Sequence, residues 1–411
     1  MTTPLKSQAP ASGGVNNKNA PPPTPYPFPV GVYESTTQDY DNTVQLGSTV
    51  AAWTSPVQAP LWNLSPTGWL RGIFFDFTLF FGSGNAAGAF ANDGPWSLIQ
   101  KVILYDLGGE VVISLLGYEW LMMNKFGGYF NVGDPRGDIT YVTNPTAGNS
   151  QASPAAHFIM YLPLEVVLRD ALGVVQNESK PGWKIELWFD TAANAVAGGK
   201  TSGGTPFTGA ATVPSVRVKG YLDSYTEPAA AAPNGRPFAQ TPPLPGSLQY
   251  WKQENTALPT GSAKFDLSNG IGFPLRNILY YTRDAADVSR STSDANWPDP
   301  ATLLIGNINY FTKGRNLWIS KVGKSYGFTG YGGAPAAADT SMGRENGVWP
   351  VYMTQDLAND PGQELRFKYI DTQVNTLIRL TGVFGGALTF FAVTNWVATP
   401  SQNRYALIAG G

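Results

Sequence analysis

The sequence predicts an all-β protein built from two tandem β-sandwiches, and three observations carry this prediction. Residues 69–81 (WLRGIFFDFTLFF) and 94–106 (GPWSLIQKVILYD) read as long apolar strands separated by a loop of Gly, Ala and Asn. Similar strands fill the second half of the chain, and helical signals are few and short. At 411 residues the chain is long enough for two domains of ordinary size.

The strands alternate with a period of two. Ile73, Phe75 and Phe77 point to one face of the first strand, whereas Asp76 and Thr78 point to the other. The same alternation runs through 184–190 (KIELWFD) and 213–225 (VPSVRVKGYLDSY). One apolar face and one mixed face are typical of antiparallel sheets that pack on one side.

Pro, Gly and Ala clusters divide the chain into segments. Short helices are predicted at 117–126, at 163–172 and around 317–322, where none is long enough to organise the fold. The loops 82–94, 191–211 and 327–345 are expected at the surface. The predicted segments are an N-terminal extended arm (1–42), a first sandwich (43–227), a linker (228–246), a second sandwich (247–398) and a C-terminal tail (399–411).

The N-terminal arm includes the run PPPTPYPFP at 21–29, which favours extended polyproline II structure. Two interpretations are open: a disordered tail, or an arm that becomes ordered against a neighbouring subunit. Aromatic residues at this density favour the second, because a purely solvated tail rarely carries them. The candidate inter-subunit arm contacts are Tyr26, Phe28, Val30 and Tyr33.

Composition restricts the function. Only 14% of the residues are charged and the net charge is −2, so much of the surface is uncharged. The Lys and Arg residues are scattered, which argues against sequence-specific nucleic-acid binding. The chain has no cysteine, which excludes disulfides and cysteine-based zinc sites. Its 52 aromatic residues (21 Phe, 19 Tyr and 12 Trp) suit large buried subunit contacts.

We find no residue pattern built for catalysis and expect a protein that is not an enzyme, with no cofactor and no metal. Glu186 and Asp190 share a strand face, but four strand residues span roughly 13 Å, too far for a glycosidase carboxyl pair. His157, the single histidine, is expected to be a hydrogen-bonded structural residue. The N-terminus lacks the apolar stretch of a signal peptide, and no apolar run is long enough for a membrane-spanning helix.

Several stretches resemble the double jelly-roll major capsid proteins of tectivirus-like bacteriophages, which are icosahedral and contain a membrane. The likeness covers most of residues 45–398, and its strength is the order of the matches. The arm departs from the pattern, because its prolines forbid the helix that such arms often include. The matching stretches are GPWSLIQKVILYD (94–106), MYLPLEVVLRDALGVV (160–175), PGWKIELWFD (181–190), NINYF (307–311), NGVWPVYMTQD (346–356) and TQVNTLIRLTGVF (372–384).

The resemblance implies that both sandwiches are eight-stranded jelly rolls and that the chain is a major capsid protein. It implies a pseudo-hexagonal homotrimer that tiles an icosahedral shell over an internal membrane. The implied partners are neighbouring capsid trimers, penton and minor capsid proteins, and the viral membrane. The implied location is the virion, with assembly in the host cytoplasm.

Two alternatives stay open from the sequence. A carbohydrate-binding or adhesin β-sandwich could stack sugars on Trp62, Trp188 or Trp297. A β-sandwich glycoside hydrolase would need two carboxylates brought together by the fold.

Overall fold

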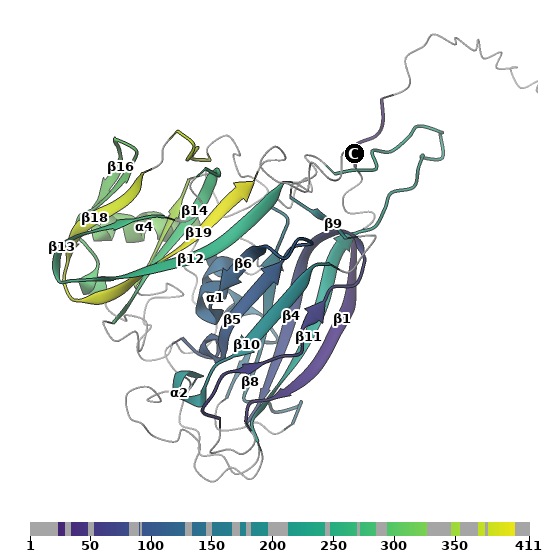
Figure 1. The fold of residues 1–411 in the computed structure, drawn as a ribbon, viewed down its shortest axis with the longest axis horizontal. Coiled ribbons are helices and arrows are strands. Elements are labelled where there is room, and N and C mark those ends of the chain that lie inside the picture. The colour runs from purple at the N-terminus through teal and green to yellow at the C-terminus, as the bar shows by residue number, and fades with distance from the viewer. Residues whose placement is uncertain are drawn as a thin grey trace, which may run out of the picture.

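The computed structural model shows two β-sandwiches lying side by side, with a few short helices (Figure 1). We call them roll 1 and roll 2. The residues that the structure describes are 24–28, 34–47, 53–81, 90, 93–127, 134–144, 150–166, 173–177, 182–195, 213–242, 247–268, 272–284, 294–326, 347–353, 369–374 and 377–398.

Roll 1 packs a six-stranded sheet against one half of a nine-stranded sheet. The six-stranded sheet has the order β1 (Glu34–Gln45), β11 (Ser215–Tyr225), β4 (Gly68–Phe80), β8 (Ala156–Pro163) and β7 (Val142–Thr143), and β9 (Val175–Asn177) also pairs with β4. The roll 1 half of the nine-stranded sheet contains β2 (Val57–Gln58), β3 (Trp62–Asn63), β10 (Lys184–Phe189), β5 (Ile99–Tyr105) and β6 (Val111–Leu115).

Roll 2 uses the other half of the nine-stranded sheet and a separate four-stranded sheet. Its half of the nine-stranded sheet has the order β12 (Leu248–Leu258), β19 (Leu388–Ala398), β14 (Leu275–Asp284) and β17 (Val348–Tyr352). The four-stranded sheet has the order β13 (Gly261–Asp266), β18 (Ile378–Phe384), β15 (Ala301–Ile305) and β16 (Ile308–Lys313).

Both rolls have one topology. When the eight principal strands of each roll are numbered along the chain, one sheet has the order 1-8-3-6 and the other 2-7-4-5 in both rolls. This is the strand order of a jelly roll. The structure therefore confirms the predicted fold class, a double jelly roll, and reveals a duplication that the residues alone show only weakly.

Each roll carries a helix after its fifth strand. In roll 1 this is α1 (Gly117–Phe126), which agrees with the predicted helix, and in roll 2 it is α4 (Arg315–Tyr326), which contains the predicted 317–322. For the helix predicted at 163–172, Pro163 ends β8 and residues 167–172 lie outside the described residues. The other helical segments are α2 (Ala192–Ala195) and the short 3-10 turns Trp96–Leu98, Pro135–Gly137 and Asp294–Asn296.

The two rolls share hydrogen-bonded backbone. The first strand of roll 2, β12, pairs in parallel with the fifth strand of roll 1, β6, through Trp251 opposite Ile113 and Lys252 opposite Ser114. This pairing makes one nine-stranded sheet out of two halves, so the rolls are joined by sheet structure as well as by side-chain packing.

Strands β14 and β19, at the centre of the roll 2 half of the nine-stranded sheet, are buried on both faces. Along β14, Tyr280 faces the core of roll 2, whereas the next residue, Tyr281, faces roll 1, and both are fully buried. On β19, Phe390 and Phe391 divide in the same way. A sheet covered on both sides needs apolar residues at every position, which explains the near-continuous apolar sequence of 388–398.

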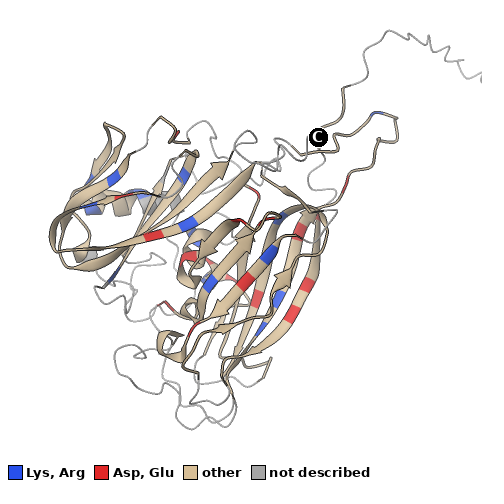
Figure 2. Cartoon of the chain, viewed as in Figure 1, with Lys and Arg blue, Asp and Glu red and all other residues tan. Residues whose placement is uncertain are grey.

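The six-stranded sheet is buried on one face only. Ile73, Phe75 and Phe77 are at most 1% exposed and face the core, which confirms the predicted alternation. The opposite face, which we call the solvent face, carries charged residues of both signs across β1, β11 and β4 (Figure 2).

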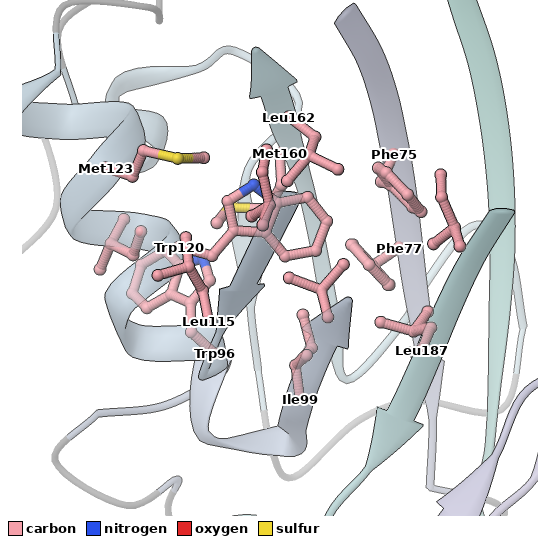
Figure 3. Close-up of a cluster of buried hydrophobic side chains, with 14 of the residues drawn as sticks. Phe75, Phe77, Trp96, Ile99, Leu115, Trp120, Met123, Met160, Leu162 and Leu187 are labelled. Atoms are coloured by element: carbon pink, nitrogen blue, oxygen red, sulfur yellow. The ribbon is translucent and has the colours of Figure 1, made fainter. Parts of the chain in front are cut away.

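Helix α1 supplies the centre of the roll 1 core (Figure 3). The Trp120 ring meets Phe75 and Phe77 edge-on, with ring centroids 4.9 and 5.9 Å apart. Its indole N–H donates to the carbonyl oxygen of Tyr161 at 2.8 Å, so the polar atom of this buried side chain is satisfied. The helix thereby contacts both β4, through Phe75 and Phe77, and β8, through Tyr161.

The first strand begins earlier than the predicted start of the first sandwich. β1 starts at Glu34, inside the segment predicted as arm, and its residues ESTTQDYDNTVQ are largely polar and exposed. Because β1 lies at the edge of its sheet, few of its side chains reach the core. The apolar alternation that marks a strand is therefore missing there.

Two adjacent tyrosines of β14 allow a matched test of the contact between the rolls. The Tyr281 hydroxyl donates to Glu119 of α1 at 2.9 Å, and that carboxylate is fully buried. The Tyr280 hydroxyl is also buried and has no hydrogen-bond partner within the described structure. We expect Tyr281→Phe to lower the free energy of unfolding by about 1–3 kcal/mol, because a buried carboxylate loses a donor.

Tyr280→Phe is the matched control, and we expect it to be neutral or slightly stabilising. Chemical denaturation of both variants measures the difference. Equal effects of the two substitutions would contradict the assignment of Tyr281 to the contact between the rolls.

Candidate assembly surfaces

The predicted arm contacts fall partly within the described residues. Tyr26 forms a parallel bridge with Phe238, and their ring centroids are 5.4 Å apart. Asn234 donates an amide N–H to the Tyr26 hydroxyl at 2.9 Å, and the Arg236 guanidinium lies 4.1 Å from the centre of the Tyr26 ring. The arm is thus held by residues of the same chain, in the segment that connects roll 1 to roll 2 in the sequence.

Phe28 lies nearer the body of the molecule. It is 7% exposed and packs with Trp69, Val174 and Tyr225, with its ring edge-on to that of Tyr225. Val30 and Tyr33 lie outside the described residues, so their contacts stay a prediction.

The segment that receives the arm turns back on itself. Ala231 pairs with Pro237, and Gly235 adopts a φ of +79° in the turn between them, a backbone conformation that favours glycine. In Figure 1 this segment extends away from both rolls. Arm and turn together form a projecting element with an aromatic surface.

The solvent face of the six-stranded sheet carries a ladder of charges. Lys219 of β11 stands between Asp41 of β1 and Asp76 of β4. Arg217 binds Asp41 with two hydrogen bonds of 2.9 and 2.7 Å. The ladder covers the middle of this face with half-buried polar groups. On the equivalent sheet of roll 2, the corresponding face carries apolar side chains.

His157 ends this ladder. Its Nε2 lies 2.8 Å from an Asp76 carboxylate oxygen and its Nδ1 lies 2.6 Å from the Thr140 carbonyl oxygen. Both partners are acceptors, so the protonated imidazolium satisfies both contacts. The hydrogen bond to Asp76 raises the pKa of His157 above its ordinary value. The histidine thus has the hydrogen-bonded structural setting that the sequence predicts.

A buried charge cluster lies beside the ladder. Arg71 occupies a bulge of β4 and binds Glu165 at 2.8 Å, and Glu34 and Asp223 also contact its guanidinium. Burial raises the pKa of Glu165 to about 7 and that of Asp223 to about 6. Desolvation outweighs the opposing attraction of Arg71, which is why proton uptake by these carboxylates is favoured.

Sequence reasoning missed this cluster, although a signal was present. Arg71 interrupts the apolar run WLRGIFF and Glu165 interrupts PLEVV. A charged residue inside a strand that is otherwise apolar needs a partner, because an unpaired buried charge is costly. Their separation of 94 residues hides that partnership in the sequence.

A third surface lies on roll 2 and is apolar. Ile308 and Tyr310 of β16 are 69% and 42% exposed, and Leu317 of α4 is 53% exposed. Scattered apolar residues are normal at a protein surface. These three belong to one strand and to the helix that follows it.

The structure argues against the tryptophans proposed for sugar stacking. Trp62 and Trp297 are 3% and 2% exposed and belong to the cores of roll 1 and roll 2, so they were wrongly considered as exposed. Trp188 is half-buried, and the Lys101 ammonium lies 5.0 Å from the centre of its ring. A face of stacked, exposed tryptophans is therefore not built from these residues.

The described part of the chain lacks two features, a cluster of metal ligands and a membrane-spanning helix. No cluster of three or more His, Cys, Asp or Glu residues with metal-binding geometry occurs in it. None of its helices has the length and apolar character needed to span a membrane.

The pairing of His157 with Asp76 predicts a pH-dependent stability. The pKa of His157 is raised by folding, so its stabilising contribution is fully present below the unfolded pKa of about 6.5 and is lost as pH rises through the folded value. We expect His157→Gln to cost about 0.5–1 kcal/mol near pH 5.5 and less near pH 9. Thermal melts of both proteins across this range measure the difference, and a cost independent of pH would contradict it.

No family model matches the sequence, and no curated protein matches it. Among solved structures, the fold is similar to the major capsid protein of Sulfolobus turreted icosahedral virus, with a TM-score of 0.50 and 15% identity over 88% of this chain and 97% of that chain. A chain in the atomic structure of the same virus gives a TM-score of 0.53 and 11% identity over 91% of this chain and 93% of that chain.

The major capsid protein P2 of bacteriophage PM2 also matches, with 10% identity over 89% of this chain and 97% of that chain. Its TM-score of 0.44 is too low to carry weight. Identities this low establish the fold alone. The chain has the double jelly-roll fold, the architecture found in these viral major capsid proteins.

Proposed function

We propose that this chain is the major capsid protein of an icosahedral virus and that its unit of assembly is a homotrimer. The observation that carries the proposal is the pair of jelly rolls with one topology, joined by parallel pairing of β6 with β12. Three such chains place six similar rolls in a ring, which gives a pseudo-hexagonal tile. Hexagonal tiles pack side by side, as the faces of an icosahedral shell require.

The surface agrees with a role in assembly. Charged residues make up only 14% of the chain, and apolar side chains are exposed at β16 and α4. The arm and the turn that receives it project from the body and offer Tyr26 and neighbouring residues to other copies. Neighbouring trimers, penton proteins and minor capsid proteins are the partners that this proposal requires.

The proposal includes a membrane inside the shell, a location in the virion, and assembly in the host cytoplasm. These parts rest on the resemblance to tectivirus-like phages. Lipid analysis of purified particles tests the membrane. Particles without lipid would remove that part of the proposal and leave the shell function intact.

The trimer itself gives the first test. We expect purified protein to have a mass of about 132 kDa by light scattering, three times the chain mass of 44.1 kDa. Burial of the lateral surfaces of each copy holds the trimer together. A monomer at all concentrations would contradict the proposal, and glycan binding by such a monomer would favour the carbohydrate-binding alternative.

The arm gives a second test. We expect the double substitution Tyr26→Ala with Phe28→Ala to leave the trimer mass unchanged and to reduce the yield of closed shells severely. The reason is that the Tyr26 ring fixes the arm on the projecting turn and the Phe28 ring fixes it on Trp69 and Tyr225 of roll 1. Electron microscopy of assembly reactions measures particle yield.

Leu107→Ala serves as a control for the arm variant, because Leu107 is 49% exposed in the turn between β5 and β6. Its particle yield should equal that of the unsubstituted protein. If the arm variant assembles equally well, the arm has no role in joining trimers.

A further inference from the structure

The contact between roll 1 and roll 2 within one chain has two halves, and we call it the junction. One half is the fifth strand of roll 1, β6, with the helix α1 that follows it. The other half is the roll 2 half of the nine-stranded sheet, whose first strand β12 pairs with β6. Tyr118 of α1 meets Tyr281 of β14 with ring centroids 5.9 Å apart, so the helix lies on the sheet face.

Roll 2 has a strand and a helix that correspond to the first half of the junction, β6 and α1. Its fifth strand, β16, is at the end of the four-stranded sheet and pairs only with β15 among the described strands. The helix that follows, α4, has Leu317 53% exposed, and β16 itself has Ile308 69% exposed. Strand and helix have the same order and topology as β6 and α1, but no element of the described chain covers them.

Roll 1 has a sheet that corresponds to the other half of the junction. Its first sheet is the six-stranded sheet, whose first strand β1 pairs only with β11 among the described strands. On the solvent face, Tyr221 of β11 stands between Gln38 of β1 and Phe74 of β4, and it is half-buried. In roll 2, β19 and β14 correspond to β11 and β4. There Phe391 lies opposite Tyr281, and both residues are buried against roll 1.

The two open halves lie at opposite ends of the molecule, with β16 at one end and β1 at the other (Figure 1). A surface and its complement on opposite ends cannot meet within one chain. They can meet between copies in a head-to-tail contact, which closes into a ring when the rotation per copy divides a full turn.

We infer that β16 and α4 of one chain dock on β1 and the solvent face of the six-stranded sheet of a second copy, and so repeat the junction between chains. The inference rests on the proposed homotrimer and names its contact surfaces. Three junctions within chains alternate with three between chains around the ring. A second copy of the chain is the occupant that these surfaces favour, because the chain already forms the same kind of contact within itself.

The two kinds of junction differ in chemistry. Within the chain, α1 meets Tyr281, and the apolar residues Leu279, Phe391 and Val393 belong to the same buried cluster as this helix. Between chains, α4 meets a sheet face that carries the charged ladder of Asp41, Lys219 and Asp76. The second junction is therefore more polar, and it suits a contact that forms after each chain has folded.

Two substitutions block the two halves separately. Leu317→Asp places a charge on α4, and Tyr221→Arg places a charge on the sheet face. Each should convert the trimer to a 44.1 kDa monomer with an unchanged melting curve of secondary structure. Val383→Asp is the matched control, because Val383 is 65% exposed on β18, two strands away from β16, and it should remain trimeric.

Mixing the two monomeric variants gives the decisive measurement. Each retains the half that the other lacks, so one junction forms and a dimer of about 88 kDa, twice the chain mass of 44.1 kDa, should appear. The ring cannot close, because both remaining ends are blocked. Light scattering of the mixture, compared with each variant alone, detects the dimer.

Three outcomes overturn the inference: either variant stays trimeric, the control dissociates, or the mixture stays monomeric. In each of these cases the unsubstituted protein is still a trimer, so the proposed function stands and only its contact surfaces are wrong. A monomeric unsubstituted protein defeats the proposed function instead.

Discussion

The architecture depends on the burial of one sheet on both faces. The roll 2 half of the nine-stranded sheet sends Tyr280 and Phe390 into the core of roll 2, and Tyr281 and Phe391 toward roll 1. Hydrophobic burial stabilises by roughly 25 cal/mol for each Å² of apolar surface, so a sheet covered twice contributes through both of its faces. Because β12 also pairs with β6, separation of the rolls would expose that surface and break a sheet at once. The two rolls therefore form one structural unit.

Periodicity predicts those strands whose surroundings differ on the two faces. The alternation of Ile73, Phe75 and Phe77 with Asp76 specifies a sheet with one wet face, and the continuous apolar run of 388–398 specifies a covered one. The helix at 117–126 is also predictable from the sequence, since it interrupts the strand pattern with helix-forming residues. Each of these signals lies within one element, which is why the residues alone reveal it.

Features that depend on distant partners escape such reasoning. β1 is an edge strand of polar residues, and only its pairing with β11 shows that it belongs to the sheet. The association of Arg71 with Glu165 and Asp223 joins three strands or strand ends far apart in the chain. The predicted contacts of Tyr26 and Phe28 with a neighbouring subunit stay a prediction, and the sequence does not show that within the chain Tyr26 packs on Phe238 and Phe28 on Tyr225. In all three cases the partner residues are distant in the sequence, so only the folded structure shows the contact.

In the proposed assembly, the duplication lets the contact observed within one chain recur between chains. Two rolls with one topology present the same two halves of a junction, and the chain satisfies one pair within itself. The pair inside the chain is buried and largely apolar, with the Tyr281–Glu119 hydrogen bond inside it, so it forms as the chain folds. The pair left open is polar on the side of roll 1, where Lys219 and Asp76 occupy the place of buried apolar side chains. In the proposed assembly, that polarity means that the free chain exposes less apolar surface before it meets a copy. A large exposed apolar face is an aggregation liability, so we propose that the difference between the two sheets favours ordered growth of the closed ring.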